Sequence, residues 1–163
     1  MNAHNSFRHT TILPRFGDAF RGLLIAYREE PNLRFHVFAG ACAAVAGRAV
    51  GLVGWEVAYL VATITLVLLA EMVNTAVERT VDLAADGRRH PLAAMAKEVA
   101  AGGVLLSAGH AAFAAAFLFL IERSLGATLG ALWALLGTSP LWFALPLLAG
   151  ILGLVGGARG SRY

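Results

Sequence analysis

The sequence predicts an all-helical integral membrane protein, and three observations lead to that fold class. Hydrophobic residues make up 58% of the 163 residues and charged residues only 14%, against about a quarter charged in typical globular chains. Two stretches without Asp, Glu, Lys or Arg, 99–121 and 124–158, are 23 and 35 residues long, and about 20 apolar residues are enough to cross a bilayer. Finally, the basic residues gather on one side of the spans that these stretches define.

Composition also excludes several classes of protein. The net charge of +3 is carried by residues that lie between apolar runs, whereas a nucleic-acid-binding face needs a clustered, solvated basic stripe. We therefore expect no nucleic-acid partner. Cys42 is the only cysteine, which excludes an intramolecular disulfide and a cysteine-based zinc site.

The chain is expected to have three parts. Residues 1–34 form a cytoplasmic and membrane-surface region, residues 35–121 form a core of three spans, and residues 122–163 form an extension with an interfacial helix and a fourth span. In the first part, apolar side chains recur at helical spacing while Arg and Asp occupy the other faces: Phe16, Phe20, Leu23, Leu24 and Tyr27. This pattern predicts an amphipathic helix on the membrane surface, or packed on the protein's own core. No apolar run of signal-peptide type precedes residue 35, so we predict no cleaved signal.

The four spans follow from the apolar runs and their breaks. The first needs residues 35–47 to continue past Arg48 towards Gly54, and the second runs from about residue 57 through Glu78. The third is 99–121 and the fourth is 141–157. The turn-forming residues 137–140 (GTSP) break the last run, so residues 125–136 are predicted as an interfacial or re-entrant helix.

Topology follows from the positive-inside rule. With four spans and both termini in the cytoplasm, only Arg48 and Arg123 lie outside. The other eleven of the thirteen basic residues lie inside: Arg8, Arg15, Arg21, Arg28, Arg34, Arg79, Arg88, Arg89, Lys97, Arg159 and Arg162. Such an asymmetry is the usual sign of cytoplasmic loops, and it places the protein in the cell (inner) membrane. Trp55, Trp133 and Trp142 fall at the outer interface, where tryptophans anchor spans.

Three acids and an amide share one face of the second span. Glu71, Asn74, Glu78 and Asp82 lie within about 80° of one another on a helix. Glu78 and Asp82 can be read as helix-end charges paired with Arg79, Arg88 or Arg89. A role as a helix-end charge explains Glu71 less well, because it is expected to lie about 10 Å below the cytoplasmic surface of the hydrocarbon core. Ionisable groups at such depth indicate function, and this depth suits a lipid hydroxyl.

Other charged residues on the cytoplasmic side complete a possible phosphoryl-transfer site. They are Glu29, Glu30, Arg88, Arg89, His90, Lys97 and Glu98. Carboxylates from two segments can hold Mg²⁺ beside phosphate oxygens, basic groups can neutralise those phosphates, and a carboxylate can take the proton of a lipid hydroxyl. The sequence has no GxxxxGK[ST] motif, which excludes a standard soluble nucleotide-binding fold.

At these residues the chain resembles the prokaryotic diacylglycerol kinase and undecaprenol kinase family of small membrane enzymes. The matching stretches are 15–36 (RFGDAFRGLLIAYREEPNLRFH), 71–82 (EMVNTAVERTVD) and 90–107 (HPLAAMAKEVAAGGVLLS). The E-x-x-N-x-x-x-E-x-x-x-D pattern followed by A-K-[DE] is the specific part of the resemblance. It covers about residues 15–121 and leaves the fourth span outside.

The resemblance implies a homotrimer that transfers the γ-phosphate of MgATP to a lipid alcohol, undecaprenol or diacylglycerol, in active sites shared between protomers. It implies that Glu71 is the general base and that Glu30 and Glu78 bind the metal. The groups that line the nucleotide site would be Asn74, Asp82, Lys97 and Glu98, with Arg88, Arg89 and His90 in the loop that contacts ATP. The pattern Glu30-x-Asn32-x-Arg34-x-His36 is more similar to the undecaprenol branch.

The chain departs from the family pattern at two places. Glu98 stands where the family usually has Asp, which adds one methylene beside Lys97. The family's arginine near the start of the surface helix has no direct equivalent: Thr11 falls closest, and Arg8 or Arg15 can substitute.

Two histidines are predicted to have structural roles. His36 lies on an apolar segment and is expected to be a packing or interface residue, since a lone histidine says little about chemistry. His110 lies within the third span with no charged neighbour in sequence, and a neutral, hydrogen-bonded role is expected for it.

Two alternatives to a lipid kinase stay open. One is a small transporter or channel subunit whose intramembrane acids relay protons or bind cations. Such a relay needs polar groups in the outer half of the membrane, where residues 57–70 offer only Tyr59, Thr63 and Thr65. The other is a scaffold that kept the fold without catalysis, against which the presence of Glu71, Glu78 and Lys97 speaks.

Overall fold

The computed structural model describes residues 12–159, and side chains from 15 to 155. Within that range the chain is all helical and contains no strand. In order, the elements are α1 (Ile12–Glu29), α2 (Pro31–Ala49), α3 (Trp55–Ala85), α4 (Pro91–Ala116), the π-helical turn η1 (Phe117–Ile121), α5 (Leu125–Thr138), the 3₁₀ turn η2 (Pro140–Phe143) and α6 (Ala144–Arg159). The predicted all-helical class is confirmed. Arg8, Thr11 and Arg162 lie outside the described residues.

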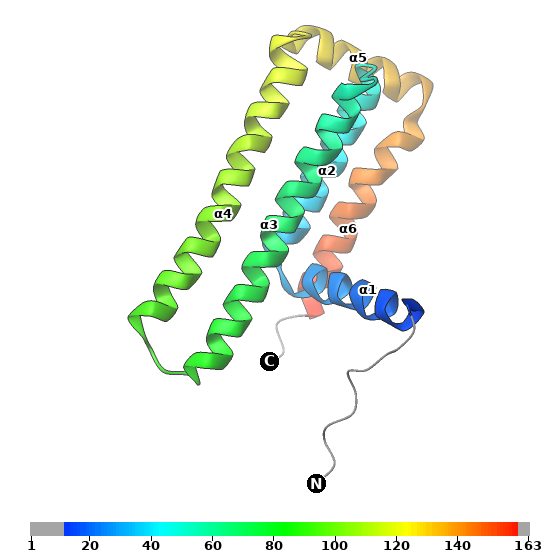
Figure 1. Cartoon of the computed structure of the whole chain (residues 1–163). Helices are drawn as coiled ribbons and strands as arrows, with labels where there is room; N and C mark the ends of the chain where they lie inside the picture. Colours follow the sequence, from blue (N-terminus) through cyan, green and yellow to red (C-terminus); the bar gives the residue numbers. More distant parts are fainter. Residues whose placement is uncertain (1–11, 160–163) are drawn as a thin grey trace.

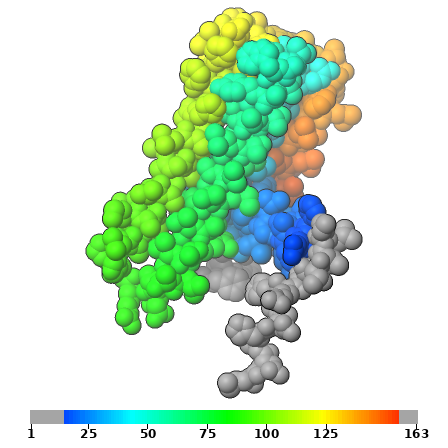
Figure 2. Space-filling model, viewed as in Figure 1, coloured from blue at the N-terminus to red at the C-terminus, as the bar shows by residue number. Residues whose placement is uncertain are grey.

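Four helices run alongside one another in the order α4, α3, α2, α6 (Figure 1). α5 crosses one end of this group, and α1 lies across the other end, against α2 and α6 (Figure 1). The green end of the α3–α4 hairpin extends past α1 (Figure 2). α1 therefore lies beside the hairpin and leaves its tip free.

Two helices of the described part are long and apolar enough to cross a membrane: α3, and α4 with its continuation to Ile121. A third candidate span is the pair Leu125–Thr138 and Pro140–Val155, which is bent by 111°. The bend lies where residues 137–140 predicted a break, and whether α5 is interfacial or re-entrant stays a prediction. The class of integral membrane protein is thus supported.

The expected first span corresponds to α2, which begins at Pro31 and ends at Ala49, short of Gly54. Its composition, rich in Ala and Gly, does not reach the hydropathy of the candidate spans. α2 nevertheless runs beside the candidate span α3 (Figure 1). A first span at α2, and with it the four-span arrangement, therefore stays a prediction. The helices that contain the second and third predicted spans are longer than those spans. α3 continues to Ala85, and α4 begins already at Pro91.

The ends of α3 follow from local backbone chemistry. Asp86 and Gly87 have φ angles of 48° and 70°, a left-handed pair that ends a helix and that Gly adopts without strain. Pro91 then stands at the first turn of α4, where its missing N–H costs nothing. With 31 residues, α3 is about 46 Å long at 1.5 Å per residue, longer than a hydrocarbon core of about 30 Å.

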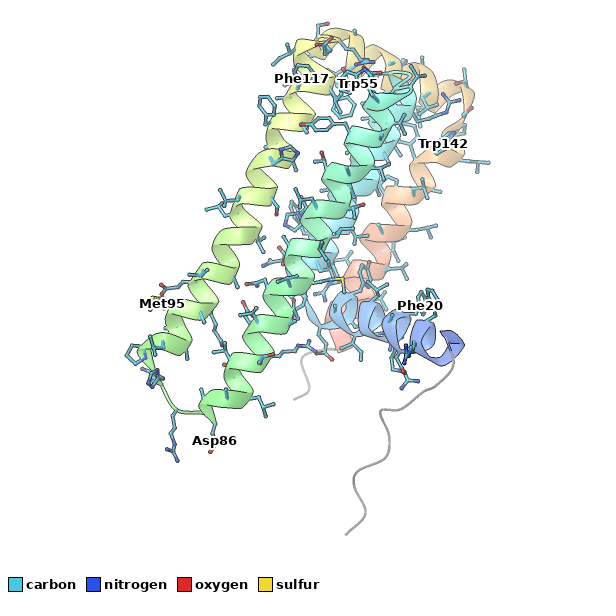
Figure 3. The ribbon with its side chains drawn as sticks, in the orientation of Figure 1. Phe20, Trp55, Asp86, Met95, Phe117 and Trp142 are labelled. Atoms are coloured by element: carbon cyan, nitrogen blue, oxygen red, sulfur yellow. The ribbon has the colours of Figure 1, made fainter. Side chains whose placement is uncertain are left out.

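The apolar core lies at the end of the bundle opposite Asp86. Its buried members are Leu52, Leu60, Leu118 and Phe119. Trp55, Phe117 and Trp142 lie at this end, while Asp86 and Met95 lie at the other (Figure 3). The two bases predicted outside have partners near the core: Arg123 pairs with Glu56 at 2.7 Å, and Arg48 lies 5.7 Å from the ring centre of Trp142.

Close contact between α2 and α3 depends on Gly47. A Cβ atom at this position would come within 2.9 Å of both Leu52 Cδ1 and Leu60 Cδ2.

We predict that Gly47→Val lowers the stability of the detergent-solubilised protein by about 1–3 kcal/mol, the usual cost of overpacking a core. Thermal unfolding should show a lower Tm for Gly47→Val and little change for Gly109→Val, because a Cβ at Gly109 meets nothing within 4 Å. An equal fall in both variants would contradict the packing argument.

Candidate functional site

Glu71 is a buried carboxylic acid in the middle of α3. Only 3% of the residue is exposed, and Val67 and Thr75, one turn before and after it, are buried as well. Thr75 Oγ1 donates a hydrogen bond to the Glu71 carbonyl at 3.0 Å. An acid so enclosed needs a polar partner, because burying an unpaired charge is costly.

His36 of α2 is that partner. Its Nε2 atom lies 3.2 Å from Glu71 Oε1. The two helices approach closely one turn further along α2, where a Cβ on Gly40 would come within 2.9 Å of Ile64 Cγ2. The expectation of a packing role for His36 therefore missed a contact with the proposed base. A signal was present in the sequence, since Gly40 lies on the same face of α2 as His36.

Two further carboxylates gather near Glu71. Glu30 and Glu78 both lie close enough to interact electrostatically with its side chain. Asn74 Nδ2 donates to Glu78 Oε1 at 2.9 Å, while Asn74 Oδ1 is buried without a hydrogen-bond partner. Glu30 and Glu78 thus lie within electrostatic range of Glu71, and the Asn74 side chain, bonded to Glu78, keeps a buried amide oxygen without a partner.

Arg79 connects α3 to the corner between α1 and α2. Its Nη2 atom lies 2.5 Å from Glu29 Oε2 and 3.5 Å from Glu30 Oε1. The interpretation of Glu78 and Asp82 as partners of Arg79 is therefore wrong, because Arg79 pairs with the acids of another segment.

Lys97 and Asp82 form a second ion pair, between α4 and α3. Lys97 Nζ lies 2.5 Å from Asp82 Oδ1, and the Asp82 side chain is 68% exposed. The neighbouring Glu98 is also exposed. Asp82 is eleven residues beyond Glu71, about 16 Å along the helix axis.

The tip of the α3–α4 hairpin holds an open cavity of about 690 Å³. Its polar lining includes Asp86 and the three predicted loop residues, Arg88, Arg89 and His90. His90 is also the N-cap of α4, and its Nδ1 accepts a hydrogen bond from the Leu92 N–H at 3.2 Å. With two guanidinium groups, this cavity suits a phosphate-bearing ligand.

The predicted site residues are therefore spread along α3 and beyond its end. Glu71, Asn74, Glu78 and Asp82 follow one another over about 16 Å of the helix axis, Lys97 pairs with Asp82, and Arg88, Arg89 and His90 lie at the tip. Among the described residues, no three His, Cys, Asp or Glu side chains form a ready metal site. This is compatible with Mg²⁺, which typically takes one or two carboxylates and completes its shell with phosphate and water oxygens.

His110 has the role that the sequence predicts. Its Nε2 lies 3.4 Å from Thr63 Oγ1, and its ring meets the Tyr59 ring edge-on at 5.7 Å. The residue thus joins α3 to α4, about 12 Å along α3 from Glu71.

Comparison with known proteins points to one family. A family model described as prokaryotic diacylglycerol kinase matches residues 17–119. A protein named diacylglycerol kinase from Synechocystis is 39% identical over 97 residues, which cover 60% of this chain and 55% of that protein. A protein named undecaprenol kinase from Bacillus subtilis is 38% identical over 106 residues, 61% of this chain and 84% of that protein. No solved structure matches the chain.

The match spans little more than half of the Synechocystis protein. The proposed site residues from Glu30 to Glu98 fall within residues 17–119, whereas the candidate Arg15 precedes that range and α5 and α6 lie beyond it.

We predict that the contact between His36 and Glu71 stabilises the fold. His36→Leu leaves a buried carboxyl group without its partner and should lower the free energy of unfolding by about 1–3 kcal/mol. The double variant His36→Leu/Glu71→Leu should recover part of that loss, because both polar partners are then gone. Unfolding in detergent measures both effects, with Leu106→Ala at an exposed position of α4 as control. A His36→Leu protein as stable as the wild type would contradict this role.

Proposed function

Since the chain belongs to the prokaryotic diacylglycerol kinase family, we propose that it phosphorylates a lipid alcohol with MgATP at the cytoplasmic face of the membrane. Glu71 takes the proton of the lipid hydroxyl, and the hydroxyl oxygen forms a bond to the γ-phosphorus of ATP. The bond from that phosphorus to the bridging oxygen breaks, and ADP leaves with its electrons. The products are a lipid phosphate and ADP.

The observation that carries this proposal is the burial of Glu71 beside His36. An acid that is 3% exposed and 3.2 Å from an imidazole sits where a general base has to meet a hydroxyl within the membrane. The imidazole orients the carboxylate and leaves its second oxygen for the lipid hydroxyl. A solvent-exposed acid at a helix end would lack this arrangement.

The residues near Glu71 fit a magnesium ion. Mg²⁺ prefers hard oxygen donors, and Glu30, Glu78 and the unpartnered Asn74 Oδ1 supply them from two segments. A bound Mg²⁺ would neutralise negative charge on the transferred phosphate. Glu30 and Glu78 would hold it, and Asn74 would keep Glu78 in position through its 2.9 Å hydrogen bond.

The cationic residues fit the rest of ATP. Lys97, paired with Asp82, lies between the level of Glu71 and the cavity with Arg88, Arg89 and His90. Glu98, or an N-terminal arginine such as Arg15, would complete the lining. A homotrimer with shared active sites, which the family resemblance implies, would bring groups of a neighbouring protomer to these residues.

Both undecaprenol and diacylglycerol remain candidate substrates, because relatives carry both names. Each offers a primary hydroxyl on a long apolar body, as the depth of Glu71 requires. The proposed location is the inner membrane, with both termini in the cytoplasm.

A proton relay is less well supported. The polar contact of Thr63 with His110 lies about 12 Å from Glu71 along α3. The buried Val67 lies between them on the same face. The described residues of α3 thus show an apolar break where a relay needs a polar group.

The first test is the transfer reaction itself. We predict that purified protein transfers labelled phosphate from MgATP to undecaprenol or diacylglycerol in a panel that also contains ceramide. Omission of Mg²⁺ should abolish the reaction. No transfer to any lipid would overturn the proposal in favour of the transporter or the scaffold.

Glu71→Gln tests the base. The amide keeps the size of the side chain and can still hydrogen-bond to His36, but it cannot accept the proton. We predict a fall in kcat of about 10²–10⁴-fold with unchanged folding and ATP binding. A rate near that of the wild type would refute the assignment.

Glu78→Ala tests the metal ligand. This variant should need a higher Mg²⁺ concentration for half-maximal activity, whereas Glu98→Ala, at an exposed position, should need a smaller increase. Unchanged Mg²⁺ dependence in Glu78→Ala would exclude Glu78 as a ligand.

A further inference from the structure

The extension beyond the family match packs on the face of α2 that points away from α3. α6 lies against α2 and α1 (Figure 1), and a Cβ on Gly150 would be in van der Waals contact with the Phe38 ring at 3.6 Å. We propose that α6 is a brace: it holds the corner between α1 and α2 and so positions Glu30 for metal binding. This inference rests on the proposed function of Glu30 and assigns a role to α6.

The first contact of the brace is a hydrogen bond between α1 and α6. The Tyr27 hydroxyl donates to the Ala149 carbonyl oxygen at 3.1 Å, across 122 residues of sequence. Gly153 lies one turn after Ala149, where a side chain would stand beside that carbonyl. A Cβ on Gly153 would lie 3.9 Å from the Tyr27 hydroxyl oxygen, so a larger side chain would compete with the tyrosine for this space.

The second contact runs through Arg34 at the start of α2. Its Cβ and Cδ atoms lie 3.6 and 3.7 Å from the position of a Cβ on Gly153. Its Nη1 donates to the Arg28 carbonyl at 2.8 Å and to the Tyr27 carbonyl at 3.5 Å. Carbonyls in the last turn of a helix lack partners within the helix, so Arg34 closes the end of α1. α6 therefore supports both helices at the point where they meet.

From this corner the path to the site is short. Glu30 is the single residue between α1 and α2, and its N–H donates to the Ala26 carbonyl at 2.9 Å. Pro31 fixes the following turn, since its φ angle is restricted. The Glu30 carboxylate points to α3, where it forms an ion pair with Arg79. It also interacts electrostatically with Glu71. Loosening the corner should therefore move the Glu30 carboxylate relative to α3.

Two variants weaken the brace without touching the proposed catalytic residues. Tyr27→Phe removes the hydrogen bond to Ala149, and Gly153→Leu places a bulky side chain between α6 and Arg34. Gly130→Leu makes the same substitution on α5, where a Cβ meets nothing within 4 Å, and serves as the matched control. Binding of Mn²⁺ with a non-hydrolysable ATP analogue, followed by the EPR signal of free Mn²⁺ relative to the same mixture without protein, measures the site without turnover.

We expect Tyr27→Phe and Gly153→Leu to raise the Mn²⁺ dissociation constant by about three- to tenfold, the effect of losing one hydrogen bond. Gly130→Leu should leave it unchanged. In a Glu30→Gln background the two substitutions should add no further loss, because the ligand that they position is already gone. Unchanged binding in both variants, or a full additional loss in the Glu30→Gln background, would overturn the brace.

Hydrogen exchange of the corner separates this inference from the proposed function. Amides of residues 28–34 should exchange faster in Gly153→Leu than in the wild type or Gly130→Leu. If the wild type binds no Mn²⁺ with the analogue, the metal role of Glu30 fails, and the proposed function with it. If the wild type binds but the corner amides of Gly153→Leu exchange at the wild-type rate, the brace alone is overturned.

Discussion

The arrangement of this protein depends on keeping a carboxylic acid at membrane depth. Glu71 lies in an apolar helix where water cannot solvate it, so another segment must bring a polar group to it. That group is His36, and its approach requires α2 to lie directly against α3, which Gly40 and Gly47 permit. The position of α2 in turn fixes the corner with α1 and hence the place of Glu30. One buried acid thus constrains three helices.

The sequence predicted the helical fold well because hydropathy and charge are strong signals in a membrane chain. The acids of α3 were assigned to one face from spacing alone, and the break predicted at residues 137–140 agrees with the 111° bend between the last two helices. The predicted ends of the helices were less accurate, because α3 continues to Ala85, beyond the predicted end at Glu78. Apolar runs mark where a helix is lipid-soluble, whereas a C-cap such as the Asp86–Gly87 turn marks where it ends.

Contacts between segments distant in sequence could not be read from spacing. The partner of Arg79 is 49 or 50 residues away, on Glu30 and Glu29, and the partner of Glu71 is on a helix that looked like ordinary apolar packing. Pairing of this kind depends on how α1 and α2 turn at Pro31, which sequence periodicity does not encode. The sequence was enough to predict which residues belong to the candidate site. Their hydrogen-bond and ion-pair partners could be identified only from the three-dimensional structure.

The uneven position of the core has a consequence for motion. The buried cluster of Leu52, Leu60, Leu118 and Phe119 lies at the end opposite Asp86, whereas Leu83 and Val99, nearer the hairpin tip, are each more than 70% exposed in the single chain. Regions with few buried contacts open at lower free energy than the core. The tip of the α3–α4 hairpin, where the exposed Lys97–Asp82 pair joins the two helices, should therefore open at a lower free energy than the end that holds the buried cluster.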